Sequence, residues 1–138
     1  MVKSDQDDKK IRGFAVLINS ILLPLNENTK FREKFRETNV KILLNASNLN
    51  HAAILIIEKG RIRVESIPNK PKENLKKKKV GWNAFVEMDT QTFLTIVLNR
   101  LSIFEIARMW ITRSIKIRGI RKLLTLLKVI QFLTNNSE

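Results

Sequence analysis

The side chains that most often carry out catalysis are scarce in this sequence. Among 138 residues there is a single histidine, His51, and there is no cysteine or tyrosine. Because proton transfer near neutral pH most often uses histidine, an enzyme built from this chain would depend on Asp, Glu or Lys. His51 has no second histidine and no clear acidic partner nearby in the sequence, so we interpret it as a structural or surface residue. The lack of cysteine also excludes disulfides, thiol catalysis and zinc–thiolate sites.

The acidic residues do not form a recognisable catalytic pair. Glu87 and Asp89 lie two positions apart, which places both on one side of a strand. Solvation and helix capping explain these two carboxylates better than general acid and base catalysis does. The chain also lacks a glycine-rich phosphate loop. The sequence therefore predicts no catalytic residues, no cofactor and no metal, and hence a protein that is not an enzyme.

Basic residues give the chain a formal net charge of +13. Such a charge favours an anionic partner, either nucleic acid or the surface of an anionic membrane, although a solvated basic face explains it equally well. Four consecutive lysines, Lys76–Lys79, follow a segment with two prolines and are predicted to lie in a mobile surface loop. A second basic series is Arg113, Lys116, Arg118, Arg121 and Lys122. The neighbouring aromatic residues lie in apolar contexts, so they do not offer the stacking platforms that single-stranded nucleic acids need.

Apolar periodicity predicts the elements that would position any site. An amphipathic helix is expected from residue 11 to Pro24, followed by a short charged helix around Phe31 and Phe35. Runs rich in β-branched residues predict strands at 40–47, 51–59 and 61–67, with a hairpin turn at Lys59–Gly60.

The second half of the chain continues with a strand that places Trp82 and Val86 on one face and Phe85 on the other. Asp89 or Thr90 then caps a helix, and a further short helix begins with capping-box spacing at Ser102–Glu105. A last strand at 113–118 follows this helical crossover, which permits parallel pairing, and leads through Gly119 into an apolar helix at 120–133. This order indicates one α+β domain at 10–134, after a flexible tail at 1–9, with a mainly antiparallel sheet and the helices on one face.

The predicted helices carry more apolar surface than one small sheet can cover. In the helix at 120–133 the apolar residues occupy more than one face. One interpretation is a dense core with a dimer interface, and the other is an apolar cavity between the sheet and its helices. Burial of an acyl chain contributes about 0.8 kcal/mol per methylene, so such a cavity would bind lipid without a catalytic residue.

The apolar runs are too short to cross a membrane. The first run is broken by Asn19 and Pro24, and Lys128 interrupts the last one, whereas a span needs about 20 apolar residues. The first ten residues are polar and do not resemble a secretory signal. We therefore expect a soluble, cytoplasmic protein.

The segment from Trp82 to Leu127 resembles the C-terminal half of the type-two sterol carrier protein family. The resemblance rests on "FVEMDTQTFLTIVLNRLS", "IFEIARMW", "RSIKIRG" and "IRKLLTLLKVI", which match a capped helix after a strand, a short helix, a basic strand and a final helix. With the less specific upstream strands it extends over residues 40–133. The sequence departs from the family at Asn99 and Arg113, where glycine is usual, and at Ile120, where a polar residue is usual.

This resemblance implies a five-stranded sheet whose helices enclose a lipid-binding tunnel, with the C-terminal helix over its mouth. The ligand would be a fatty acyl chain, an acyl-CoA or a sterol-like or isoprenoid-like molecule, which the protein would bind and could transfer. We expect Lys76–Lys79 to contact an anionic membrane surface. The cavity is expected to be lined by Trp82, Val86, Phe93, Val97, Leu98, Phe104, Met109, Trp110, Leu124 and Leu127. The alternatives are a basic nucleic-acid-binding protein and a cavity-free homodimeric interaction module.

Overall fold

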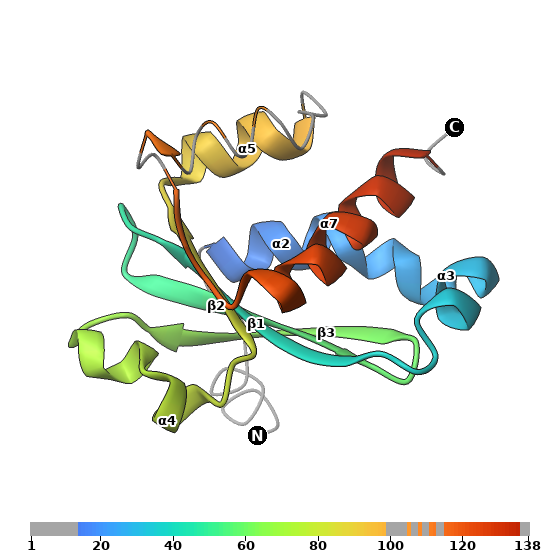
Figure 1. The fold of residues 1–138 in the computed structure, drawn as a ribbon, viewed down its shortest axis with the longest axis horizontal. Helices are drawn as coiled ribbons and strands as arrows, with labels where there is room; N and C mark the ends of the chain where they lie inside the picture. Colours follow the sequence, from blue (N-terminus) through green and yellow to red (C-terminus); the bar gives the residue numbers. More distant parts are fainter. Residues whose placement is uncertain (1–13, 99–104, 106–107, 109–110, 113–114, 136–138) are drawn as a thin grey trace, which may run out of the picture.

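A five-stranded sheet forms the centre of the protein (Figure 1). The computed structural model describes residues 14–98, 105, 108, 111–112 and 115–135. The strand order is β3-β2-β1-β4-β5, and the parallel pair is β1 with β4, while the other neighbours are antiparallel. The strands are β1 (Asn39–Ala46), β2 (His51–Glu58), β3 (Arg61–Pro68), β4 (Ala84–Met88) and β5 (Lys116–Arg118). The predicted mixed, mainly antiparallel α+β sheet is confirmed, but its parallel pair is central rather than formed by the last strand.

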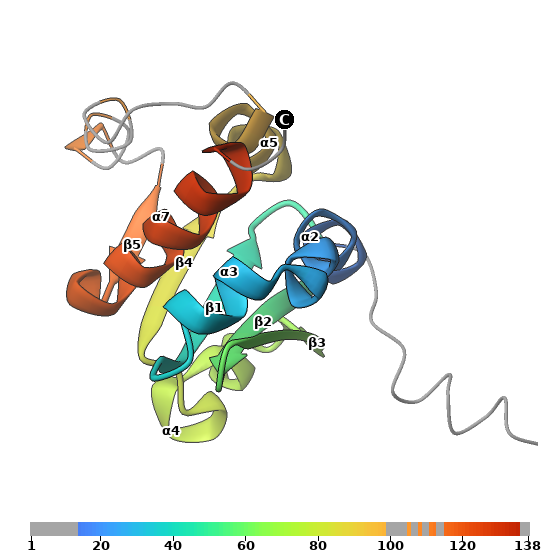
Figure 2. The same ribbon diagram turned by 90° about the vertical axis from the view of Figure 1, so that its right-hand side faces the viewer.

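The helices cover the two faces of the sheet unequally. Figures 1 and 2 show α2, α3, α5 and α7 on one face, which we call the helix side, and the segment containing α4 on the opposite face, which we call the open side. The helix side carries α2 (Phe14–Leu22), the 3-10 helix η1 (Leu23–Glu27), α3 (Thr29–Lys34), α5 (Thr90–Leu98) and α7 (Ile120–Asn135). The open side carries η2 (Lys72–Leu75) and α4 (Lys77–Val80). None of the helices within the described ranges has the length and hydropathy that a membrane crossing requires.

The main core lies between the sheet and the helix side. Alternate residues of β1, Ile42 and Leu44, point into it, because successive side chains of a strand face opposite ways. The ring of Phe31 in α3 lies 4.6 Å from that of Phe35 and 5.5 Å from that of Phe132 in α7. Each fully buried side chain of this size contributes about 1.5–3 kcal/mol, so these aromatic contacts fix α3 and α7 together. β2 is buried along most of its length, as expected for a strand covered on both faces.

Local sequence signals for turns and caps behave as predicted. Lys59 and Gly60 have φ values of 53° and 78°, which is the backbone of a type I′ hairpin turn. Asp89 caps α5, because its Oδ1 accepts a hydrogen bond of 2.7 Å from the Thr92 amide. The hydrogen bonds from Thr92 lower the pKa of Asp89.

The lysine run does not form a loop throughout as predicted, because Lys77–Lys79 belong to the helical turn α4.

Candidate ligand-binding sites on the two faces of the sheet

The sequence-predicted lipid-binding residues are distributed over several parts of the fold. Val86 and Phe93 belong to the helix-side core, where the Phe93 ring meets that of Phe14 edge-on at 4.9 Å. On α7, Leu124 is 48% exposed and Leu127 is half-buried. Val97 and Leu98 belong to α5, while Phe104, Met109 and Trp110 lie outside the described residues.

A small apolar cavity occurs on the helix side, where α2, α5 and α7 meet β1. Its volume is about 10 Å³, which is about the space of a single water molecule, so this cavity is too small for an acyl chain. Among the predicted residues whose side chains the structure describes, Phe93 lines it. The lining consists of Ile18, Ile21, Leu22, Leu44, Phe93, Leu126 and Ile130. The apolar spacing of α2 and α7 predicts that their apolar side chains belong to the core. It does not indicate which of them border a cavity.

A much larger concavity, of about 680 Å³, lies on the open side. We call it the open-side cavity. It is bordered by the segment 69–82 and by residues of β1, β4 and β5. Its lining is Asn45, Ser47, Asn69, Lys70, Lys72, Leu75, Lys76, Lys77, Trp82, Phe85, Glu87, Lys116 and Arg118.

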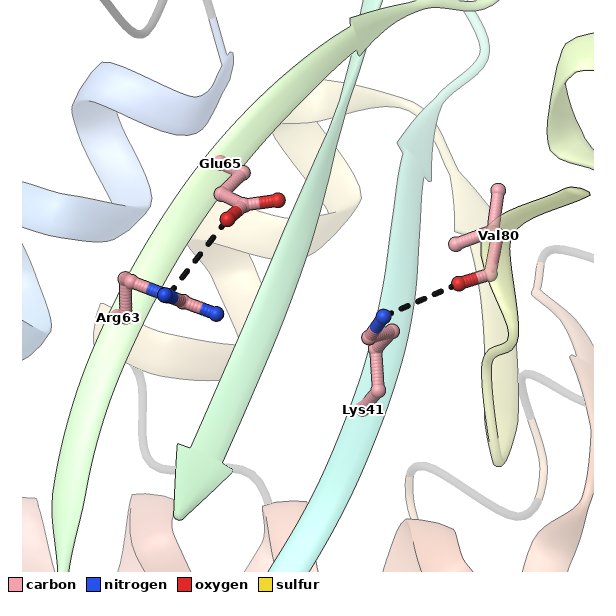
Figure 3. A network of polar contacts seen from close by, with 4 residues as sticks. All are labelled: Lys41, Arg63, Glu65 and Val80. Carbon is pink, nitrogen blue, oxygen red and sulfur yellow. Dashed lines mark hydrogen bonds and ion pairs between the residues drawn. The ribbon is translucent and has the colours of Figure 1, made fainter. Parts of the chain in front are cut away.

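Specific contacts with β1 hold this covering segment in place. Lys41 of β1 donates a 3.2 Å hydrogen bond from its Nζ to the carbonyl of Val80, at the end of α4 (Figure 3). Asn83 and Lys41 also exchange hydrogen bonds of 2.7 and 2.8 Å. The Trp82 indole Nε1 donates to the carbonyl of Leu75 at 2.9 Å, which closes the segment on itself. The cavity wall is therefore preformed.

The aromatic end of the cavity is built from Trp82 and Phe85. Their ring centroids lie 5.6 Å apart with an interplanar angle of 35°, and the Lys77 ammonium lies 5.6 Å from the Trp82 ring. The sequence-based prediction that Trp82 shares a face with Val86 is wrong. Gly81 adopts a left-handed φ of 75° and β4 begins only at Ala84, so strand alternation does not extend back to residue 82.

The opposite end of the cavity is polar. Asn69 is 5% exposed and donates 2.9 Å hydrogen bonds from Nδ2 to Asn45 Oδ1 and to the Leu49 carbonyl. Asn45 in turn donates to Glu87 Oε1 at 2.9 Å. The Asn69 Oδ1 atom has no hydrogen-bond partner within the described part of the chain. A buried acceptor left unsatisfied in this way costs about 1–3 kcal/mol.

Cationic side chains surround this cavity. Six exposed bases line it, and Glu87 is the one carboxylate among its lining residues. Within the described ranges none of these bases forms an ion pair, and the ion pair that is present, Arg63–Glu65 at 3.6 Å, lies on β3 (Figure 3). Lys78 and Lys79 do not line the cavity. The six bases are Lys70, Lys72, Lys76, Lys77, Lys116 and Arg118.

The geometry does not provide a catalytic or metal centre among the described residues. His51 is half-buried at the start of β2, and the described part of the chain holds no group of three His, Asp or Glu side chains that could bind a metal ion. The expected lipid-binding face and the lysine run at 76–79 lie on opposite sides of the sheet, because α4 lies across the sheet from α2 and α7 (Figure 2). A membrane contact through the lysines would therefore turn the helix side away from the lipid.

Comparison with solved structures connects this architecture to known folds. Sterol carrier protein 2 from Yarrowia lipolytica, in its apo form, aligns with a TM-score of 0.61 and 18% identity over 92% of this chain and 98% of that chain. A ubiquinone synthesis protein described as UbiJ-SCP2 aligns with a TM-score of 0.58 and 9% identity over 91% of this chain and 92% of its own. The sec-alkyl sulfatase PisA1, as a double mutant, aligns with a TM-score of 0.59 and 14% identity over 86% of this chain.

The sulfatase is a much larger protein, and this chain covers only 16% of it. No protein-family model matches the sequence, and no curated protein matches it significantly. The likeness is thus one of structure. The sheet order, the helices on one face and these alignments show that the chain adopts the fold of sterol carrier protein 2.

Proposed function

We propose that this protein binds a lipid without chemical conversion and holds its apolar chain between the sheet and helices α2, α5 and α7. The observation that carries the proposal is the wholly apolar cavity at the junction of these helices with β1. The fold supports it, because two of the aligned structures are named for sterol carrier proteins.

Ligand entry requires the helix layer to open, because a cavity of about 10 Å³ holds no acyl chain. Burial of about ten methylenes contributes about 8 kcal/mol, which offsets most or all of the cost of separating two or three apolar side chains at about 1.5–3 kcal/mol each. Outward displacement of α7 would part Leu126 and Ile130 from Ile18 and Ile21 of α2. We therefore place the entrance between α2 and α7.

The test is titration of the purified protein with a fluorescent fatty acid, cis-parinaric acid, accompanied by mass spectrometry of lipids that copurify. The informative variant is Ile130→Phe, which fills the helix-side cavity from a half-buried position. The matched control is Leu124→Phe, which adds the same ring at an exposed position on the same helix.

We expect saturable binding by the parent protein, at least about tenfold weaker binding by Ile130→Phe and unchanged binding by Leu124→Phe. Circular dichroism of each variant checks that the fold is retained. Absence of saturable binding by the parent, or an equal affinity of both variants, would contradict the proposed function.

A further inference from the structure

We infer that the open-side cavity is a second binding site, independent of the proposed lipid site, and that it takes a small organic phosphate with a flat apolar body. The two sites lie on opposite faces of the sheet, and they share no lining residue. The juxtaposition that carries the inference is an aromatic wall at one end of a preformed cavity whose rim is cationic.

The size of the cavity suits a small molecule. Ligand pockets in proteins are commonly about 300–1,000 Å³, and the open-side cavity measures about 680 Å³. The helix-side cavity is far smaller, at about 10 Å³. The open-side cavity therefore needs no opening of the fold before a ligand enters.

The aromatic end selects a flat apolar group. The indole of Trp82 is half-buried and is held by its hydrogen bond to Leu75, so its ring is oriented before any ligand arrives. Leu75 and Phe85 are buried beside it and give the cavity an apolar floor. Stacking on a fixed ring costs little ordering entropy, and every planar ring system has a face that can stack.

The rim selects an anion of more than one charge. Lys70, Lys72, Lys76 and Lys77 come from the covering segment, whereas Lys116 and Arg118 come from β5. Bases from both sides thus converge on one cavity that contains a single carboxylate, Glu87, and that carboxylate already accepts from Asn45. A phosphate group placed between these bases would relieve the repulsion among their positive charges and accept several charge-assisted hydrogen bonds from them.

The polar end suits the linking part of such a ligand. Ser47 and the buried Asn45–Asn69 pair line that end, and the Asn69 carbonyl oxygen lacks a donor within the described residues. A hydroxyl on the ligand is the kind of donor that this end lacks. A soluble organic phosphate and the headgroup of a phospholipid both carry a phosphate group, and the experiment separates these two sources.

The experiment is a nitrogen-15 NMR titration of the full chain with phenyl phosphate, with inorganic phosphate and neutral benzyl alcohol as comparison ligands. We expect phenyl phosphate to shift the Trp82 indole N–H and the amides around Lys76 and Lys116, and to leave α2 and α7 unchanged. We expect it to bind at least about fivefold more tightly than inorganic phosphate, and benzyl alcohol to give no saturable shift. Shifts confined to α2 and α7, or equal binding of the three ligands, would overturn the inference.

A matched pair of double variants separates the cavity from general charge. Lys76→Gln with Lys77→Gln removes two bases from the cavity lining, whereas Lys78→Gln with Lys79→Gln removes two neighbouring bases outside it. All four side chains are exposed, so both variants should fold. We expect about tenfold weaker phenyl phosphate binding for the first and less than about twofold for the second. Equal losses of phenyl phosphate affinity would show that the effect comes from diffuse charge and would refute a site.

Cosedimentation with phosphatidylcholine vesicles that contain phosphatidic acid identifies the source of the phosphate. Capture that depends on Lys76 and Lys77, but not on Lys78 and Lys79, assigns the cavity to a lipid headgroup. Phenyl phosphate binding without such capture assigns it to a soluble organic phosphate. Both results support a phosphate-binding site, but only phenyl phosphate binding supports its selection of a flat apolar body. Failure of both probes refutes the site. Because these readouts concern the open side, they are independent of fatty acid binding on the helix side.

Discussion

Gly119 joins β5 to α7 and is a position where a single methyl group should have a large effect. Its φ of 70° lies in the left-handed region, and a Cβ there would overlap the carbonyl oxygen of Asn83 and lie 3.1 Å from the Ala84 Cα. Both neighbours are backbone atoms, Asn83 just before β4 and Ala84 at its start, so neither can rotate away. Gly119→Ala should therefore push β5 and α7 away from the sheet.

The expected magnitude follows from the sum of these effects. The left-handed backbone costs an alanine about 1–2 kcal/mol, overpacking adds about 1–3 kcal/mol, and restriction of the unfolded chain returns about 0.4–1 kcal/mol. The net loss in the free energy of unfolding is roughly 1–4.5 kcal/mol. Gly81 provides a control, because its φ is 75° but its Cβ would meet nothing closer than Lys41 Nζ at 4.0 Å. Gly81→Ala should cost only about 0.5–1 kcal/mol.

The assay is urea denaturation of both variants and the parent, followed by circular dichroism and analysed with a common slope. A loss for Gly119→Ala that exceeds that for Gly81→Ala by at least about 1 kcal/mol supports the reasoning. Losses that agree within about 0.5 kcal/mol would show that the backbone contact at residue 119 does not constrain the fold.

Three further predictions concern the helices. Asp89→Ala should lower the free energy of unfolding by about 1 kcal/mol at neutral pH, because α5 loses its N-cap. The folded pKa of Asp89 lies below its ordinary value of 3.8. The difference in the free energy of unfolding between Asp89→Ala and the parent should therefore be full above that value and vanish as pH falls through the lowered pKa. Urea titrations at several pH values would check this. On α7, Leu126→Glu should unfold the protein, because burying the charge costs several kcal/mol, whereas the exposed Leu124→Glu should change stability by less than about 0.5 kcal/mol, as thermal melts would measure. Leu127→Glu, at a half-buried position, should weaken cis-parinaric acid binding more than it lowers stability, and unfolding of this variant would instead place Leu127 in the core.

Features set by local chemistry could be predicted from the sequence. The Lys59–Gly60 turn needs two residues with positive φ, and Phe31 and Phe35 lie one helical turn apart on an otherwise charged helix. The basic alternation around Ile117 identified β5, in which Lys116 and Arg118 face away from the helix-side core. In each case the decisive residues lie within a few positions of one another.

Features set by contacts between distant segments could not be predicted in this way. The pairing of β1 with β4 depends on the whole β2–β3 hairpin lying to one side, which no local pattern encodes. The orientation of Trp82 follows from the backbone of Gly81. The composition of the lysine run does not distinguish a helical turn from a loop. The open-side cavity combines residues from Asn45 to Arg118, and its only signals were the lysine run and the polar side of β5.

The aromatic contact between α3 and α7 has a consequence for biosynthesis. Phe31 emerges early from the ribosome, but its partner Phe132 is added after all five strands have been made. Until then the helix-side surface of β1 and β4, including Ile42 and Val86, has no cover from α7. Apolar sheet surface exposed in this way is prone to aggregation, so the nascent chain is a natural client for chaperones that shield hydrophobic segments. Folding to the native state is thereby coupled to synthesis of the final helix.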